Sequence, residues 1–384
     1  MSNVPEPRIC FVGLQNLPIL APEFGHLGAG GEQVQQTLLA RALATRGWEV
    51  SMVVGDYGQP DAATWTGVTT YKAYAPDAGL PIIRFVHPRW SNLWRAMHRA
   101  HADIYYPSCA AAQVGQAALF TRAFGRRMIY RVASDADCDP ARVLIRYWRD
   151  RKLYEFGLRR ADAVLVQTAS QQGALRTNFA VDGRVAGMLV ERPDHVLPIQ
   201  HRDVTVIWVG NLLPVKRPEL LVKLASSLPA TSFHVVGGAV AGHDMTSRTF
   251  QQQSTAVPNL TAHGHVAYQS VGRLYDRARI LINTSVVEGF PNTYLQAWIR
   301  GIPVVAFFDP DGIIVREGLG RVVNSIDEMR AAVTKLANDD EIWLQTSRRC
   351  LAYMAREHAD EQVLRPYLET IESLRSGHAG STEQ

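Results

Sequence analysis

The feature that most constrains the fold is a regular alternation between short, continuously apolar runs and longer segments with a helical repeat. In the first 200 residues, the apolar runs that predict strands are 8–14, 48–55, 102–107, 126–134 and 161–170. Helical patterns lie between them, at 32–47, 110–124 and 141–160. Strands that are apolar throughout and separated by helices are typical of a parallel sheet covered on both faces. The sequence therefore predicts a doubly wound α/β domain.

The second half of the chain repeats this alternation. Its predicted strands are 204–211, 232–238, 260–266, 279–285 and 302–308, and its predicted helices are 218–228, 270–278, 291–301 and 340–375. Segment 192–203 has two prolines and no periodicity, which is typical of a linker. We therefore predict two domains, 1–198 and 199–355, followed by a segment 356–384 that ends in a polar tail. Ligands of such folds bind beyond the carboxyl ends of the strands, so the loops at those ends are the candidate sites.

Composition and charge exclude several classes of function. Of the 384 residues, 47% are hydrophobic and 20% are charged, which is typical of a globular protein. The net charge of +4 is too small to indicate nucleic-acid binding, and residues 1–200 hold the surplus, with 22 basic and 17 acidic side chains. The four cysteines form no CxxC pair, so neither a zinc site nor a disulfide framework is expected. The expected location of the protein is a reducing cytoplasm. No stretch approaches the ~18 uninterrupted apolar residues of a membrane span.

A glycine-rich loop, GHLGAGGEQ (25–33), precedes the helical pattern at 32–47. Backbone N–H groups around Gly28, Gly30 and Gly31, together with the positive end of the helix, could face an anion. The same loop could also be a flexible turn. It is neither a dinucleotide fingerprint nor a Walker loop, because no GxGxxG ends the first strand and no GK[ST] follows.

The second segment of interest is VGNLLPVKRPELL (209–221), in which a strand ends at Gly210 and Lys216 lies just before a helix. An ammonium group at this place could meet the diphosphate of a ligand. The alternative is a solvated surface charge.

The third segment, NTSVVEGFPNTYLQAWIRGIPVV (283–305), is the most informative. Glu288 lies beside a glycine in an apolar loop and is well placed to hydrogen-bond sugar hydroxyls. Asn292 and Thr293 open a helix whose first N–H groups can hold phosphate oxygens. Gln296 lies one turn further, on the same side as Asn292. A capped helix with an incidental acid would not account for the Gly-Phe-Pro loop.

Together these segments resemble the retaining GT-B glycosyltransferases of family 4, the group 1 glycosyl transferases. The resemblance extends over about residues 8–375, and its strongest part is SVVEGFPNTYLQAWIRGIPVV, supported by VGNLLPVK and by GGEQ with LLARALATRGWEVSMVVG. It implies two Rossmann-like domains facing across a cleft. It also implies an acceptor on the N-terminal domain, a nucleotide-sugar mainly on the C-terminal domain, and a last helix that crosses back to the first domain.

By matching position, the resemblance assigns roles to the motif residues. Lys216 would neutralise the donor diphosphate and Glu288 would contact the transferred sugar, which makes these two the predicted catalytic residues. Donor binding is predicted for residues of all three segments: Gly30, Gly31, Gly210, Gly289, Phe290, Pro291, Asn292, Thr293 and Gln296.

The sequence departs from the family pattern at three places. The second of the paired glutamates is Gln296, which loses a charge at the position that usually grips the ribose. The arginine that usually follows the second glycine motif is Asn211, so one cation is missing. The histidine of the first domain is not evident, because Ser134 and Asp135 occupy its region.

Alternating carboxylates in DADCD (135–139) raise the question of a metal site. A calcium loop is not expected, because Pro140 stands where the tight-turn glycine belongs and Arg146 where the bidentate glutamate belongs. The GT-B resemblance makes a metal unnecessary, and no metal or other cofactor is predicted. Asp135 is instead a candidate acceptor-binding residue, with a solvated loop as the alternative.

The predicted helix at 141–160 carries seven basic residues against Asp150 and Glu155, and Leu144, Tyr147, Trp148 and Tyr154 give it an aromatic, apolar component. Such a helix could lie on an anionic membrane surface, which would place the protein on the inner face of the membrane, or it could simply be solvated.

The sequence therefore predicts a metal-independent, retaining hexosyltransferase. Its donor would be a UDP- or GDP-sugar and its acceptor a glycan or a lipid-linked glycan in cell-surface polysaccharide or glycolipid biosynthesis. A catalytically degenerate GT-B binding partner and a GT-B UDP-sugar epimerase are the alternatives, and nucleic acid is not an expected partner.

Overall fold

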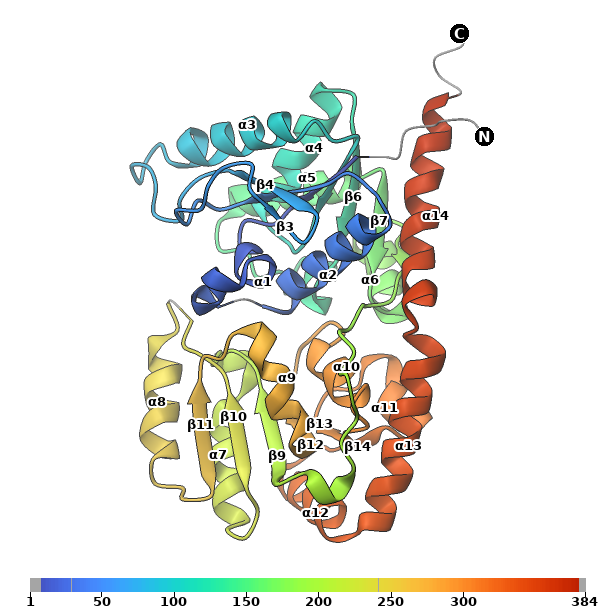
Figure 1. Cartoon of the computed structure of the whole chain (residues 1–384). Helices are drawn as coiled ribbons and strands as arrows, with labels where there is room; N and C mark the ends of the chain where they lie inside the picture. Colours follow the sequence, from blue (N-terminus) through green and yellow to red (C-terminus); the bar gives the residue numbers. More distant parts are fainter. Residues whose placement is uncertain (1–7, 29, 241, 380–384) are drawn as a thin grey trace. The chain divides into compact units, whose positions relative to one another are not determined.

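A computed structural model describes residues 8–28, 30–240 and 242–379, and part of the predicted polar tail lies outside these residues (Figure 1). Its contacts divide the chain into two compact units. Unit 1 comprises Met1–Phe24, Gly31–Leu189 and Glu361–Gln384, and unit 2 comprises Gly25–Gly30 and Val190–Asp360.

Unit 1 contains one eight-stranded sheet with the order β3-β4-β2-β1-β5-β6-β7-β8. Its strands are β1 (Ile9–Val12), β2 (Val50–Val54), β3 (Thr64–Trp65), β4 (Val68–Lys72), β5 (Ile104–Pro107), β6 (Arg127–Arg131), β7 (Ala163–Val166) and β8 (Arg184–Val185). All neighbours pair in parallel except the short hairpin of β3 with β4. The central strands β1, β2 and β5 are buried along their whole length, which is why their sequences are apolar without alternation.

The described residues of unit 1 also form the α-helices α1 (Leu17–Leu20), α2 (Gly31–Thr45), α3 (Ser91–Ala100), α4 (Ala112–Ala123), α5 (Trp148–Arg160), α6 (Ala169–Phe179) and the C-terminal α14 (Asp360–Ala379). Helices α4 and α5 approach closely because glycines lie at their contact. A Cβ atom on Gly115 would lie 2.3 Å from the carbonyl oxygen of Leu153. Helix α14 is bound to the rest of unit 1 through Tyr367, whose hydroxyl donates to the carbonyl of Gly187 over 2.7 Å.

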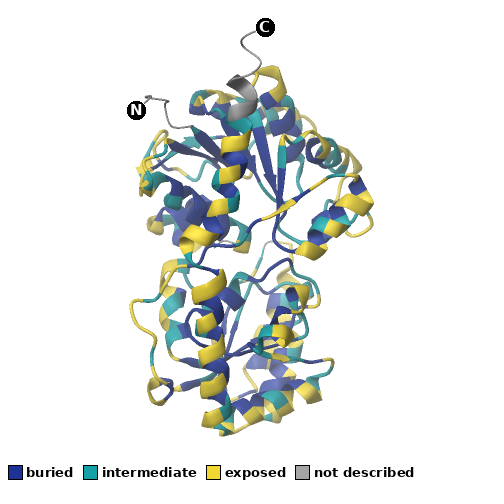
Figure 2. Ribbon diagram, turned by 90° about the vertical axis from the view of Figure 1, so that its right-hand side faces the viewer, coloured by how far each residue is buried: buried dark blue, intermediate teal, exposed yellow. Residues whose placement is uncertain are grey.

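Unit 2 contains a six-stranded sheet, parallel throughout, with the order β11-β10-β9-β12-β13-β14. Its strands are β9 (Val204–Val209), β10 (Phe233–Val236), β11 (Leu260–Gly264), β12 (Ala278–Asn283), β13 (Val304–Ala306) and β14 (Gly320–Val322). Its helices are α7 (Pro218–Ser227), α8 (Asp244–Ser254), α9 (Tyr268–Asp276), α10 (Asn292–Trp298), α11 (Ile313–Glu317), α12 (Ile326–Asn338) and α13 (Asp340–Glu357). In Figure 2 the strands are mostly dark blue, whereas many helices carry one exposed and one buried face, as a sheet covered on both sides requires.

Two predicted helices are wrong in their limits. The helix predicted at 141–160 begins only at Trp148; residues 141–142 form a turn, 143–145 have no regular secondary structure, and 146–147 form a bend. The helix predicted at 340–375 is two helices, because α13 ends at Glu357 and α14 starts at Asp360. No helix in the part of the chain that the structure describes has the length and apolarity to cross a membrane.

Candidate functional site

The candidate site of unit 2 lies where the neighbouring strands β9, β10 and β12 end. Their carboxyl ends are packed tightly: a Cβ atom on Gly237, just after β10, would lie 1.9 Å from the carbonyl oxygen of Gly210, just after β9. Only glycine fits position 237, so the backbone of these two loops can lie in direct contact.

Lys216 and Glu288, the two predicted catalytic residues, form an ion pair between the Lys216 ammonium and Glu288 Oε1. Lys216 ends a short 3-10 turn, Pro214–Lys216, that follows β9, and Glu288 lies in the loop that follows β12. Because β9 and β12 are neighbours in the sheet, residues 72 positions apart in sequence meet at one edge. The side chains are 24% and 13% exposed, so the pair is half-buried and still open to solvent.

A second contact fixes the Lys216 backbone at this edge. The hydroxyl of Thr284, directly after β12, donates to the carbonyl oxygen of Lys216. The Thr284 hydroxyl oxygen in turn accepts a hydrogen bond of 3.0 Å from the indole N–H of the buried Trp208. This chain of hydrogen bonds holds the Lys216 turn against β12, which limits the positions open to the ammonium.

The donor-binding residues predicted at 289–296 lie next to this pair. Gly289, Phe290 and Pro291 are buried, and the Phe290 ring packs against Trp298 at a centroid distance of 6.3 Å. In α10, the predicted residues Asn292, Thr293 and Gln296 are the partly exposed ones, while the helix buries Tyr294, Leu295, Ala297 and Trp298. The structure therefore places the polar side chains of α10 on the side of the helix that is not packed into the core.

Asn211, the position of the missing cation, directly follows Gly210 and is partly exposed. Its backbone carbonyl accepts a hydrogen bond of 2.8 Å from the N–H of Leu213, which tightens the turn before Lys216. The residue therefore has a structural role in the loop through its backbone.

The glycine-rich loop is divided between the two units. Gly30 belongs to the short segment Gly25–Gly30 that is grouped with unit 2, whereas Gly31 begins α2 in unit 1. Within the segment, the carbonyl of Gly25 contacts Nε2 of His265 at 2.8 Å. Gly28 has φ +73° and lies against the same imidazole, since its Cβ would be 3.5 Å from His265 Cε1. Residue 29 of the loop lies outside the described residues.

The carboxylates at 135–139 are each held by a different group. Asp135 accepts from the amide of Gln171 at 3.0 Å, and Asp139 accepts from the N–H of Ala141 at 2.8 Å. Asp137 is buried and accepts from the N–H groups of Ala133 and Ser134, and burial raises its pKa from 3.8 to about 6. Within the described ranges, no group of three His, Cys, Asp or Glu side chains is arranged to hold a metal ion. Asp135 therefore remains a predicted acceptor-binding residue, with Gln171 beside it.

Sequence reasoning missed a polar cluster at the carboxyl ends of β5 and β6 in unit 1. Glu32, in the first turn of α2, accepts a hydrogen bond from the hydroxyl of Ser108, and burial of the carboxyl raises its pKa from 4.5 to about 7. Arg131, at the end of β6, opposes this rise by its charge. The Arg131 guanidinium is buried and donates to the carbonyls of Val166 and Ala186 at 3.0 and 3.1 Å. Two features of the sequence could have indicated this cluster: Arg131 is a charged residue inside an apolar strand, and Glu32 is an acidic residue directly after two glycines.

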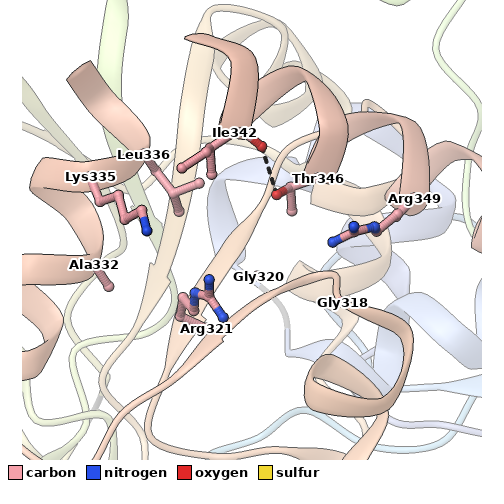
Figure 3. A pocket seen from close by; sticks show the side chains of 9 residues that line it. All are labelled: Gly318, Gly320, Arg321, Ala332, Lys335, Leu336, Ile342, Thr346 and Arg349. Atoms are coloured by element: carbon pink, nitrogen blue, oxygen red, sulfur yellow. Dashed lines mark hydrogen bonds between the residues drawn. The ribbon is translucent and has the colours of Figure 1, made fainter. Parts of the chain in front are cut away.

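Unit 2 also has a small basic cavity, which is separate from the candidate site at the ends of β9, β10 and β12 (Figure 3). Arg321 of β14, Lys335 of α12 and Arg349 of α13 surround a space of about 60 Å³ beside Gly320. It contains none of the predicted site residues.

Both halves of the chain match models of known protein families. Residues 30–188 match the family model of the glycosyl transferase 4-like domain, and residues 203–339 match that of glycosyl transferases group 1. The chain therefore contains a glycosyl transferase 4-like domain followed by a glycosyl transferases group 1 domain, in the GT-B fold. The predicted fold class, GT-B with two Rossmann-like parallel-sheet domains, is confirmed.

Among solved structures, this GT-B chain is similar to sucrose-phosphate synthase from Thermosynechococcus elongatus. The TM-score is 0.77 at 16% identity, over 97% of this chain and 100% of that one. It is also similar to HepE of Anabaena, solved with UDP and glucose. The TM-score is 0.72 at 15% identity, over 96% and 100% of the two chains.

Among curated proteins, the chain is 30% identical over 146 residues to the O-antigen biosynthesis glycosyltransferase WbnH of Escherichia coli. The match covers 38% of this chain and 40% of WbnH, so it spans well under half of that relative.

Proposed function

We propose that this GT-B protein transfers a hexose, with retention of configuration, from a UDP- or GDP-sugar to a glycan or lipid-linked acceptor in the biosynthesis of a cell-surface polysaccharide. The observation that carries the proposal is the Lys216–Glu288 pair at the carboxyl ends of β9 and β12. The partial match to an O-antigen glycosyltransferase and the similarity to a fold solved with UDP and glucose support the class of acceptor and of donor.

The chemistry follows from the charges of the pair. Lys216 supplies a fixed positive charge that would stabilise the diphosphate as its negative charge grows on departure. Glu288 supplies a carboxylate that can accept hydrogen bonds from hydroxyls of the transferred sugar. The two would therefore act on opposite sides of the bond that breaks, one on the leaving group and the other on the sugar.

Proton removal from the acceptor is assigned to the leaving diphosphate. In such a front-face displacement the incoming hydroxyl approaches from the side of the leaving group, and its proton passes to a diphosphate oxygen as the new glycosidic bond forms. The acceptor oxygen then takes the place of the diphosphate on the same face of the sugar, and retention results. The role of the protein is to hold the two reactants and to stabilise charge.

The experiment that tests the proposal has two steps. Thermal unfolding is first measured with UDP-, GDP- and ADP-sugars, since a donor at 100 times its Kd stabilises the fold by about 2.7 kcal/mol. The stabilising donor is then incubated with membrane glycolipid extract, and the anomeric configuration of the product is determined by NMR.

Each result decides between the proposed activity and its alternatives. A product with the configuration of the donor sugar supports retaining transfer. Inverted product would refute retention. Conversion between UDP-sugars without an acceptor would indicate an epimerase, and absence of both stabilisation and turnover would indicate a non-catalytic binding partner.

A further inference from the structure

Large apolar side chains are exposed in two short segments of unit 1. The most exposed are Ile82 at 94%, Leu144 at 86% and Trp148 at 78%. Four others in the same segments are also exposed: Leu80, Ile83, Val86 and Tyr147. We call residues 80–89 and 142–149 together the apolar-basic surface.

The two segments of the apolar-basic surface are in contact. The guanidinium carbon of Arg149 lies 3.4 Å from the centroid of the Phe85 ring, which is a close cation–π contact. Phe85 also packs edge-on against Trp90 at a centroid distance of 5.6 Å. Residues 64 positions apart in sequence thus join the two segments into one surface.

These exposed residues do not result from a loosely held loop. Val143 and Ile145 pack against the buried core of unit 1, while Leu144 between them is turned outward. Phe85 is partly buried under Arg149, while Val86 beside it is exposed. Each segment is therefore anchored by some of its apolar side chains and presents the others to the surroundings, at a cost in exposed apolar area that a partner would recover.

The charge of the apolar-basic surface is uniform. Its eighteen residues include five arginines, Arg84, Arg89, Arg142, Arg146 and Arg149, and no Asp or Glu. Arg149 is paired with Asp150, directly after the surface, at 2.8 Å, and Arg151 and Lys152 in the next turn of α5 are paired with Glu155. The positive charge of the surface that no ion pair offsets among the described residues is therefore that of Arg84, Arg89, Arg142 and Arg146, which all lie before α5.

We propose that the apolar-basic surface docks on an anionic lipid bilayer. Aliphatic side chains such as Ile82 and Leu144, with the Trp148 ring, would enter the boundary between headgroups and acyl chains. The arginines would lie at the lipid phosphates. A second copy of the chain fits less well, because a two-fold contact would bring five arginines against five others.

The docking is independent of the proposed transfer reaction and is tested without donor or acceptor. The purified full chain is sedimented with vesicles of phosphatidylcholine containing phosphatidylglycerol and with vesicles of phosphatidylcholine alone. We expect binding to the anionic vesicles, and weaker binding as salt is raised. Trp148 is the one exposed tryptophan among the eight, so its fluorescence should shift to the blue on binding, and Trp148→Phe should remove the shift.

Two variants separate the apolar contribution from the charge contribution. Ile82→Ser with Leu144→Ser should lower the partition coefficient tenfold or more on anionic vesicles. Arg142→Gln with Arg146→Gln removes two exposed charges and should lower the partition coefficient by roughly thirtyfold. This estimate assumes that each arginine contributes as much to binding as one basic side chain usually does at an anionic membrane surface. The control is Met245→Ser in unit 2, which replaces another strongly exposed apolar residue (78%) and should leave binding unchanged.

Circular dichroism on each variant verifies folding, so loss of binding cannot be mistaken for unfolding. The proposal is overturned if the wild-type chain does not bind anionic vesicles, or if the two surface variants bind as well as the wild type. It is also overturned if light scattering shows a dimer that the Ile82→Ser, Leu144→Ser variant loses, because the surface would then bind a second copy.

Discussion

Replacing Lys216 by alanine removes the positive charge from the end of β9 without touching the core, because the side chain lies at the solvent-open edge of the sheet. At an effective dielectric constant of about 20, one charge at about 4 Å stabilises another by about 4 kcal/mol, which sets an upper limit. Glu288 already offsets part of the charge of Lys216, so the gain from a new negative charge on the diphosphate is smaller. We therefore expect kcat/KM to fall by ~10²–10³, the range for loss of one group that stabilises developing charge.

The kinetic parameters distinguish this role from simple donor binding. If Lys216 stabilises the leaving diphosphate, kcat itself should fall, whereas loss of binding alone would raise KM and leave kcat unchanged. Glu288→Gln keeps the shape and removes the charge, so it should lower turnover more than the affinity for the bare nucleoside diphosphate. The assay is release of nucleoside diphosphate at varied donor concentration, with the affinity measured separately by calorimetry.

Two controls make the result decisive. Lys223→Ala removes an exposed lysine from α7 of the same unit and should leave kcat and KM unchanged. The double variant Lys216→Ala, Glu288→Gln should cost less than the sum of its parts, because the two side chains are in contact. Full donor binding and full turnover in both single variants would refute the location of the active site and with it the transferase reasoning.

Three further predictions concern other parts of the chain. Gln296→Glu should be tolerated and should tighten donor binding, measured by calorimetry, because it provides a second acceptor charge for ribose hydroxyls; a large loss of affinity would show that the residue does not face the donor. Transfer should continue in EDTA, and a loss that only Mn²⁺ or Mg²⁺ restores would favour a metal at Asp135–Asp139. The raised pKa of Glu32 means that the folded state binds more protons than the unfolded state between about pH 4.5 and about pH 7, so its contribution to stability falls as pH rises through this window. The melting temperature of Glu32→Gln should therefore fall less between these pH values than that of the wild type. If the melting temperatures of the two proteins fell equally with pH, the result would contradict the burial of the Glu32 carboxyl.

Ten of the fourteen strands of the described residues were predicted from the sequence, mostly because burial on both faces leaves a continuous apolar run. The short or partly exposed strands β3, β4, β8 and β14 lack such a run and were not predicted. The helix predicted at 141–160 was wrong in its limits, and the reason lies in its first seven residues. Val143 and Ile145 face the core while Leu144 faces outward, which is the two-residue period of an extended segment and not the helical repeat. The many arginines of this region suggested one long polar helix, whereas tertiary packing divides it at Trp148.

The candidate site was predictable only in part. Lys216 and Glu288 could each be placed at the end of a strand, but their contact depends on the order of strands in the sheet, and the sequence does not show that β9 lies beside β12. The pair of Glu32 with Ser108 was missed for the same reason, since 76 positions separate them. Side-chain partners of this kind meet because strands that are distant in sequence pair in parallel. The periodicity of the local sequence does not show which strands pair.

Two of the three departures from the family pattern that the resemblance implies are complementary in charge. Asn211 lacks a positive charge and Gln296 lacks a negative one, so together they leave the formal charge of the predicted donor site unchanged. The Lys216–Glu288 pair is neutral as well, and a half-buried site is less costly to maintain when its remaining charges compensate each other than when one stands alone. A site that had simply decayed would have no reason to lose one charge of each sign while keeping the paired lysine and glutamate. Under the proposed function, the two substitutions leave Lys216 as the one predicted cation for the donor diphosphate.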